Sequence, residues 1–331
     1  MSASRRWTVP SYVATFLTWF GVATTSFVVL TVLLDWSPAP SVIAAQGLLP
    51  LIVVVALGVF AVSAIRRDWV PALAALAPTI AGSVLVVSVT TPAAEPAWAA
   101  SSARLTVFAS NVLKSNRDPD AGLRAAVESD ADVVVLSEMT VRFEAALQRS
   151  GLLQRYPTLV RETDNVLLTR LPVADQGIRR HGGVDLPSAT VIVGGRKVLV
   201  LAVHTSAPHA KGTIDTWERE FDAIDRVATD ADDVIAIGDF NAGPWNGPFR
   251  RLLDRGFVDA HDDLGHGLSR TWGPRQFGLD GAVRLLGIDH SLSRGQLAPE
   301  SIVDVEVAGS DHRGISATYA VRSDLTGPGA G

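Results

Sequence analysis

The 331-residue chain contains no cysteine. That absence excludes a disulfide-stabilised scaffold and any metal site built from thiolates, and it is compatible with every redox compartment.

Charged side chains are scarce near the N-terminus. Between Tyr12 and Thr91 only four residues are charged, and they lie between three apolar segments: Asp35, Arg66, Arg67 and Asp68 separate Tyr12–Leu34, Val42–Ile65 and Val70–Thr90. Each segment has about 20 residues or slightly more, which is enough for a helix to cross a hydrocarbon core of ~30 Å. Three such segments in succession argue against a buried hairpin of a soluble protein. A cleaved signal peptide would be followed by a polar mature region, and none follows the first segment. We therefore predict three transmembrane helices.

The distribution of arginine predicts the orientation of these helices. Arg5 and Arg6 precede the first segment, Arg66 and Arg67 lie between the second and third, and the loop from Asp35 to Pro40 has neither lysine nor arginine. The positive-inside rule places both arginine pairs in the cytoplasm. Three crossings then leave the remainder of the chain on the outer face, so we expect a multi-pass protein of the cell membrane with an extracytoplasmic domain.

The composition changes after a Pro/Ala-rich stretch that begins at Thr91. We expect four regions: a membrane anchor (1–91), a linker (92–103), a globular domain (104–322) and a disordered Gly/Pro-rich tail (323–331).

Basic residues are also under-represented in the globular part. The chain has 29 basic and 34 acidic residues, and the anchor holds four of the former and two of the latter, so 25 basic and 32 acidic residues remain, a net charge of −7. Such a domain lacks the basic surface typical of tight duplex binding. Nucleic acid is disfavoured but not excluded, because bound metal ions offset carboxylates locally.

Beyond the linker, short apolar strands alternate with polar or helical stretches, which indicates a mixed α/β domain. A helix begins at Asp118-Pro119, with Asp as its cap, and another spans about Thr213–Ala228. We expect eight strands: Leu105–Ser110, Val133–Ser137, Val166–Thr169, Ala189–Val193, Val198–Val203, Val234–Ile237, Gly287–Leu292 and Ile315–Val321.

Polar residues lie at the ends or starts of successive predicted strands. The series is Asn111, Glu138, His204, Asp239 with Asn241, Asp289, and Asp311 with His312. Taken alone, each of these residues more often belongs to a turn, or is a core histidine whose hydrogen bonds are satisfied, than belongs to a functional site. The ordered series is specific, because the ends of neighbouring strands converge in a sheet and can share one cleft.

The motifs that contain these residues resemble those of the endonuclease/exonuclease/phosphatase superfamily. They are Phe108-Ala109-Ser110-Asn111, Val135-Leu136-Ser137-Glu138, Val203-His204-Thr205, Gly238-Asp239-Phe240-Asn241, Ile288-Asp289-His290 and Ser310-Asp311-His312. The resemblance covers about Arg104 to Val321, and His290 departs from it because a tyrosine commonly follows the aspartate. It implies a four-layered, DNase I-like β-sandwich flanked by helices, here preceded by the three transmembrane helices.

The chemistry of phosphoester hydrolysis suggests a metal set. Glu138 is a hard ligand suited to Mg²⁺ or Mn²⁺, and Asn111 can add a neutral oxygen. The resemblance places Asp311 close to the same ion or to a second one.

The other residues have catalytic roles in this interpretation. We expect Asp239 to orient or deprotonate the attacking water, and Asn241 to hold a phosphoryl oxygen from the same face of an extended segment. His204 would contact another phosphoryl oxygen. The resemblance pairs Asp289 with His312, whose charged form would stabilise the transition state.

Three functions remain open on the sequence. The first is a metal-dependent phosphatase or phosphodiesterase that acts on a lipid-linked or other envelope phosphate, supported by the anchor and the acidic domain. The second is a membrane-tethered nuclease for extracellular DNA or RNA, with Arg179-Arg180-His181 and the Arg270–Arg275 stretch as candidate strand contacts. The third is an inactive membrane sensor or scaffold, which would lack at least one chemical residue, and none is missing. The expected partners are the lipid bilayer and a phosphorylated substrate, and nothing in the sequence indicates the oligomeric state.

Overall fold

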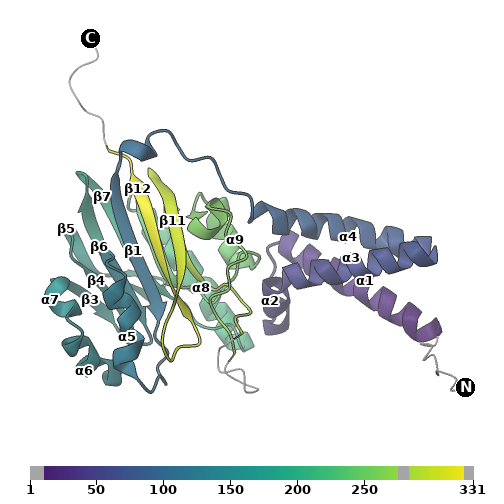
Figure 1. Cartoon of the computed structure of the whole chain (residues 1–331), viewed down its shortest axis with the longest axis horizontal. Helices are drawn as coiled ribbons and strands as arrows, with labels where there is room; N and C mark the ends of the chain where they lie inside the picture. Colours follow the sequence, from purple (N-terminus) through teal and green to yellow (C-terminus); the bar gives the residue numbers. More distant parts are fainter. Residues whose placement is uncertain (1–10, 275–282, 324–331) are drawn as a thin grey trace, which may run out of the picture.

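The computed structural model describes residues 11–274 and 283–323. Arg5, Arg6 and Arg275 lie outside the described residues, as does the predicted tail from residue 324 onward. In Figure 1, a bundle of long helices projects from one side of a β-rich globular part.

Three helices of the bundle are long and apolar enough to cross a membrane, judged by length and composition. They are α1 (Ser11–Leu33), α3 (Leu49–Arg66) and α4 (Trp69–Ser88). Their buried faces carry valine and small residues, whereas the larger side chains Phe16, Leu51 and Ile80 are 66%, 49% and 55% exposed. A helix with an apolar exterior suits a lipid environment rather than water.

The second predicted segment, Val42–Ile65, is not one helix. The chain forms the short helix α2 (Pro40–Gly47), turns at Leu48 and only then starts α3. Pro50 cannot donate a backbone hydrogen bond to the preceding turn. Gln46 is fully buried at this turn, where its side chain accepts a hydrogen bond from Ser37 and donates one to the Trp36 carbonyl. Hydropathy alone did not register this break, because the residues on both sides of it are apolar.

The globular part contains two six-stranded mixed sheets. The first has the order β11-β12-β1-β2-β4-β3. Its strands span β1 (Ala103–Asn111), β2 (Val133–Ser137), β3 (Thr158–Glu162), β4 (Asn165–Thr169), β11 (Leu297–Glu306) and β12 (Arg313–Val321). The short helix η1 (Ala99–Ser101) leads into β1.

The second sheet has the order β5-β6-β7-β8-β10-β9. Its strands span β5 (Val173–His181), β6 (Val184–Val193), β7 (Arg196–His204), β8 (Val234–Asp239), β9 (Val258–Asp259) and β10 (Asp289–Arg294). Each of the eight predicted strands lies in or overlaps an observed strand.

Helices cover the outer faces of both sheets and complete four layers. On the first sheet lie α5 (Pro119–Glu128), α6 (Val141–Arg149) and α7 (Leu152–Arg155); on the second lie α8 (Lys211–Ala228) and α9 (Gly247–Asp254), and α10 (Ala260–Asp263) follows β9. Asp118 caps α5 as predicted, since its side chain accepts a hydrogen bond from the Ala121 amide at 3.0 Å. Between the sheets, one apolar cluster includes Val107, Val135 and Val200. The predicted four-layered β-sandwich is confirmed.

The globular part is fixed to one end of the helical bundle. Asn246 donates hydrogen bonds to the Ile43 carbonyl and to Gln46, each at 3.1 Å, and the Gly247 amide donates to Ser37 at 3.0 Å. Trp245 donates its indole N–H to the Leu85 carbonyl at 3.2 Å. These contacts involve α2, the loop before it and the end of α4, so they all lie at the end opposite the α3–α4 turn (Figure 1).

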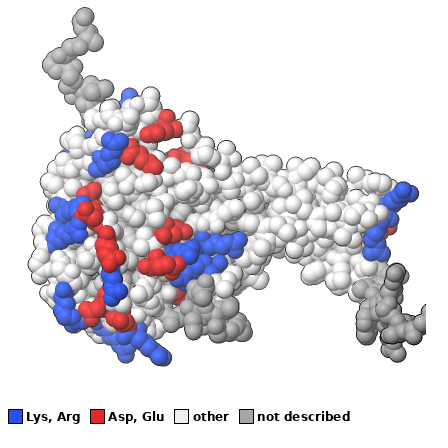
Figure 2. Space-filling model, in the orientation of Figure 1, with Lys and Arg blue, Asp and Glu red and all other residues white. Residues whose placement is uncertain are grey.

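Charged side chains are separated along the molecule. In Figure 2 they cover the globular part and the far end of the bundle, and a band without Lys, Arg, Asp or Glu lies between. The far end holds the turn from Arg66 to Asp68, at which α3 stops and α4 begins. With 20 residues at 1.5 Å each, α4 is about 30 Å long, which matches a hydrocarbon core.

Candidate active site

The strand ends do converge, as the sequence predicts. In the parallel pair β1–β2, Asn111 lies opposite Ser137, the residue before Glu138. In the second sheet Asp239 pairs with both His204 of β7 and Asp289 of β10. Together these ends form a cleft of about 540 Å³, and the candidate residues that line it are Asn111, Glu138, His204, Asp239, Asn241, Asp311 and His312.

Glu138 is held at the end of β2 in a left-handed conformation, with φ +61°. This conformation costs a non-glycine residue on the order of 1 kcal/mol and is found at functional sites. One carboxylate oxygen accepts a hydrogen bond from the Lys114 amide at 2.7 Å, and the other accepts one from the Asn111 side chain at 3.2 Å. These bonds fix the orientation of the carboxylate toward the cleft.

Asn111 connects Glu138 to Asp239. Its amide nitrogen also donates to Asp239 Oδ2 at 3.0 Å, and its oxygen accepts from the Leu113 amide at 3.0 Å. An amide oxygen has two lone pairs, so one remains for a cation. The predicted ligands Asn111 and Glu138 are therefore adjacent.

Asn241 reaches the cleft by a route that differs from the prediction. The segment after Asp239 is not extended, because Asn241 has φ +46°. Its backbone amide donates to Asp239 Oδ1 at 2.9 Å, and its side-chain amide donates to the Thr205 carbonyl at 2.8 Å. Asn adopts left-handed geometry more readily than most residues, and this turn keeps Asp239 and Asn241 on the same side.

His312 lies between two buried aspartates. Its Nδ1 is 2.9 Å from Asp289 Oδ2, and its Nε2 is 3.7 Å from Asp239 Oδ2. Burial opposes a charge on this ring, but Asp289 and Asp239 outweigh burial and raise the pKa of His312 to about 9. Burial also raises the pKa of Asp289, which is only partly offset by the charge of His312. Asp289 does not line the cleft, and its contact with His312 is the pairing that the resemblance implies.

His204 has a carboxylate partner that the sequence analysis did not identify. Asp164 Oδ1 lies 3.7 Å from its Nδ1, and both residues line the cleft. Burial lowers the pKa of His204, but the interactions with Asp164 and Asp239 dominate and raise it. The raised pKa extends the pH range over which His204 is cationic and can attract an anion.

The cleft contains an oxygen that is suited to a cation. Asp311 Oδ1 is buried and has no hydrogen-bond partner among the described residues. A buried carboxylate oxygen without a partner is costly unless a cation or an unseen donor satisfies it. With Glu138 and Asn111, Asp311 provides the hard oxygen donors that Mg²⁺ and Mn²⁺ prefer.

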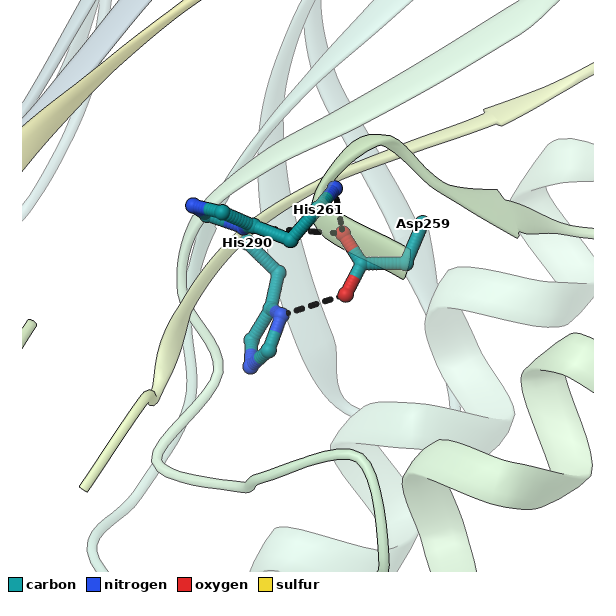
Figure 3. A group of neighbouring side chains, drawn as sticks. All are labelled: Asp259, His261 and His290. Atoms are coloured by element: carbon teal, nitrogen blue, oxygen red, sulfur yellow. Dashed lines mark hydrogen bonds and ion pairs between the residues drawn. The ribbon is translucent and has the colours of Figure 1, made fainter. Parts of the chain in front are cut away.

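A second buried cluster consists of Asp259, His261 and His290 (Figure 3). His290 Nδ1 is 2.8 Å from Asp259 Oδ2, and its Nε2 is 2.9 Å from the Ala242 carbonyl. His261 Nε2 is 3.1 Å from Asp304 Oδ1. Burial lowers the pKa of His261, but the hydrogen bonds to Asp259 and Asp304 raise it to about 10. Both nitrogens of His290 face acceptors, so the cluster is a hydrogen-bonded support for β10 rather than an open ligand set.

Three supporting residues escaped the sequence analysis. Lys114 orients Glu138 through its backbone amide, Asp164 pairs with His204, and Thr271 Oγ1 accepts hydrogen bonds from the Ile288 and Asp289 amides, each at 3.1 Å. All three residues lie outside the motifs that carry the resemblance, and Lys114 and Asp164 stand in turns.

The basic residues considered for strand binding are largely engaged elsewhere. Arg179 forms an ion pair with Asp175, and Arg180 forms one with Asp185, all within the β5–β6 hairpin. Arg270 donates to the Leu285 carbonyl at 3.1 Å. None of these three arginines lines the cleft.

Comparison with known proteins agrees with this geometry. The sequence model of the endonuclease/exonuclease/phosphatase family matches residues 108–312, whereas no curated protein sequence matches the chain. Among solved structures, humanized D. rerio TDP2 is 18% identical, with a TM-score of 0.54 over 65% of this chain and 98% of that chain. The 3′ phosphatase NExo from Neisseria, bound to product DNA hairpin, is 18% identical, with a TM-score of 0.51 over 64% and 98%. Truncated Caenorhabditis elegans TDP2 is 17% identical, with a TM-score of 0.50 over 66% and 97%.

At this level of identity the solved structures establish the shared fold, and the family match extends from β1 to His312 and therefore spans the cleft. The members of this family are phosphoester hydrolases. The chain belongs to the endonuclease/exonuclease/phosphatase family.

Proposed function

We propose that this protein is a divalent-metal-dependent phosphoester hydrolase, anchored by three transmembrane helices, whose cleft faces the outer side of the cytoplasmic membrane. Its substrate in this proposal is a lipid-linked or other envelope phosphate. The observation that carries the proposal is the fixed position of the globular part, which Asn246 and Gly247 hold against the end of the apolar bundle. A tethered cleft meets membrane substrates at a high effective concentration.

The chain's own residues suit this chemistry. Glu138, Asn111 and Asp311 would hold the cation, which when bound supplies charge neutralisation at the phosphoryl oxygens. Asp239 accepts a proton from the attacking water or orients it, since its carboxylate lies between Asn111 and His312.

The two histidines contribute positive charge. His312, held by Asp289, directs its Nε2 toward Asp239 and can donate to an oxygen on which negative charge develops. His204, paired with Asp164, offers a second cationic contact to the phosphoryl group.

The orientation is supported by the separation of charge along the molecule. The Arg66–Asp68 turn and the globular part lie at opposite ends of the bundle (Figure 2). If that turn is cytoplasmic by the positive-inside rule, the cleft is extracytoplasmic.

The test uses the full-length protein in lipid nanodiscs with Mg²⁺, Mn²⁺ or EDTA. Phosphate release would be measured from undecaprenyl pyrophosphate, undecaprenyl phosphate and simple phosphodiesters, together with nicking of plasmid DNA. We expect metal-dependent turnover of a lipid phosphate without nicking. It should be lost in Glu138→Ala and kept in Glu128→Ala, which removes an exposed carboxylate of α5.

Either of two results would contradict the proposal. Nicking that falls steeply with added salt, without lipid turnover, would indicate a membrane-tethered nuclease. No turnover with any substrate or metal would favour an inactive sensor or scaffold.

A further inference from the structure

A second cavity, of about 360 Å³, lies between the helical bundle and the globular part. One wall is α2 with the start of α3, and the other is formed by loops that flank the cleft. The membrane-side residues are Pro40, Ile43, Ala44, Gly47 and Pro50. The facing wall includes Pro244, Trp245, Leu268, Leu285, Leu286 and Ile288. This volume is within the usual range for small-molecule sites, roughly 300–1,000 Å³.

The lining has little charge. Among the described residues around the cavity, only His209 and Arg270 are ionisable, and none is a carboxylate. An apolar cavity of this kind gains little from binding a sugar–phosphate backbone, but it gains from removing hydrocarbon from water.

The cavity adjoins the catalytic cleft. Ala207, His209, Asn241 and Trp272 line both spaces. A molecule with a phosphate at Asn241 can therefore extend its adjoining portion into the cavity, toward α2.

The walls are built and fixed rather than loosely apposed. Asn246, itself 2% exposed, bonds to Ile43 and Gln46 across the junction, and a Cβ atom on Gly247 would approach the Asp35 carbonyl oxygen to 2.1 Å. By contrast, the groove on the bundle surface near Leu57, Phe60 and Ile80 is formed by the spanning helices alone and does not reach the cleft.

We propose that the cavity between α2 and the cleft binds the hydrocarbon chain of the substrate, in the portion next to its phosphate. This inference rests on the proposed function and narrows it, because it assigns the enzyme to phosphates esterified to a long apolar alcohol. A bilayer-level cavity that opens beside the catalytic residues would select such substrates over soluble phosphates.

The kinetic test compares alkyl phosphates from ethyl to dodecyl, as monoesters and as methyl diesters, with full-length protein in nanodiscs. Each methylene that leaves water for the cavity should raise kcat/KM about fourfold, and the rise should stop once the cavity is full. Ala44→Trp places a bulky ring in the cavity from an exposed position, and Leu268→Asp adds charge from the facing wall. We expect both to lower the dodecyl-to-ethyl ratio of kcat/KM at least tenfold.

The matched control is Ser41→Trp, which adds the same ring to α2 at an exposed position outside the cavity lining. It should keep the ratio of the wild-type protein. Partition into the bilayer affects all variants equally, so equal ratios in Ala44→Trp, Leu268→Asp and Ser41→Trp would overturn the inference.

A binding readout separates this inference from the proposed function. A dodecyl phosphate that carries a diazirine near its head group would be photolysed with the protein, and the labelled peptides mapped by mass spectrometry. Labelling of residues 40–50, 267–272 and 285–288 that is lost in Ala44→Trp supports the cavity even if no ester is hydrolysed, in which case only the proposed function fails. Labelling confined to the bundle surface near Leu57 and Ile80 would overturn the inference.

Discussion

At the scale of single residues, Asp289 is buried and does not line the cleft, yet it holds Nδ1 of His312 at 2.9 Å. Replacing it by Asn should leave its volume unchanged and remove the charge that orients and stabilises the protonated ring. We expect kcat of Asp289→Asn to fall about 100-fold or more.

The control for Asp289→Asn is Ser291→Ala on the same strand. It removes a buried hydrogen bond to the Tyr319 hydroxyl, at 2.7 Å, that is remote from the cleft. If the two variants have similar melting temperatures but only Asp289→Asn has a much lower kcat, Asp289 positions His312 rather than stabilising the fold. Equal losses of kcat in the two variants would contradict the role of Asp289.

Asp311 has a buried oxygen without a partner among the described residues, and we assign it to the cation. Asp311→Asn should raise the Mg²⁺ concentration for half-maximal activity at least about tenfold, because a charged ligand becomes neutral. A metal titration of activity measures this. Asp254→Asn, an exposed change on α9, should not move the midpoint. A lower kcat at an unchanged midpoint in Asp311→Asn would argue against ligation.

The carboxylates around His261 lead us to expect that the stability of the folded protein depends on pH. His261 faces Asp259, Asp304 and His290, and its pKa in the folded protein is about 10 against an ordinary value of 6.5. A raised pKa contributes stability that is complete below pH 6.5 and is lost as the pH rises through 10. The melting temperature of His261→Gln should therefore differ most from that of the wild-type protein near pH 6 and least near pH 10. A difference that stays constant with pH would exclude the charged pair as its cause.

At the scale of secondary structure, the sequence predicted the interior of both sheets and missed their edges. The eight expected strands correspond to β1, β2, β4, β6, β7, β8, β10 and β12. The four missed strands β3, β5, β9 and β11 are the edges of the two sheets. Interior strands are buried on both faces and form continuous apolar runs, whereas an edge strand such as β5 is mostly exposed and carries charges.

The same distinction applies to the site. Asn111, Glu138 and Asp239 follow or end buried strands, so their positions could be derived from the strands and from the family motifs. Lys114 contributes a backbone amide, and Asp164 lies in a hairpin turn before β4, so neither carries a sequence signal. The left-handed turn at Asn241 was also missed, because the apolar run of β8 does not indicate the backbone conformation of the polar residues that follow it.

Gly247, the first residue of α9, allows a test of how tightly the globular part is joined to the helical bundle. A Cβ at Gly247 would meet the Asp35 carbonyl oxygen at 2.1 Å, a backbone atom that cannot yield easily. Gly247→Ala should lower the melting temperature by about 3 to 10 °C and speed proteolysis of the 91–98 segment. Gly212→Ala is the control, since nothing lies within 4 Å of its Cβ and α8 gains a better helix former. Equal proteolysis rates would mean that the junction is loose.

At the scale of the whole molecule, the lack of cysteine allows the predicted orientation to be tested with single labels. Ser301→Cys places a thiol on an exposed edge of the globular part, and Asp68→Cys places one in the α3–α4 turn. A membrane-impermeant maleimide should label the first in intact cells and the second only after lysis. The reverse pattern would place the cleft in the cytoplasm.

The buried Gln46 has a consequence for how the protein is made. Its partner Asn246 is 200 residues further along the chain, so the ribosome completes all three spanning helices long before that partner exists. Until then Gln46 bonds only to partners within the anchor, such as Ser37 and the Trp36 carbonyl, and its hydrogen bond to Asn246 is missing. The anchor therefore gains this hydrogen bond only after the last third of the polypeptide is made. A chain truncated after the anchor would lack the bond, although the hydropathy of its helices would be unchanged.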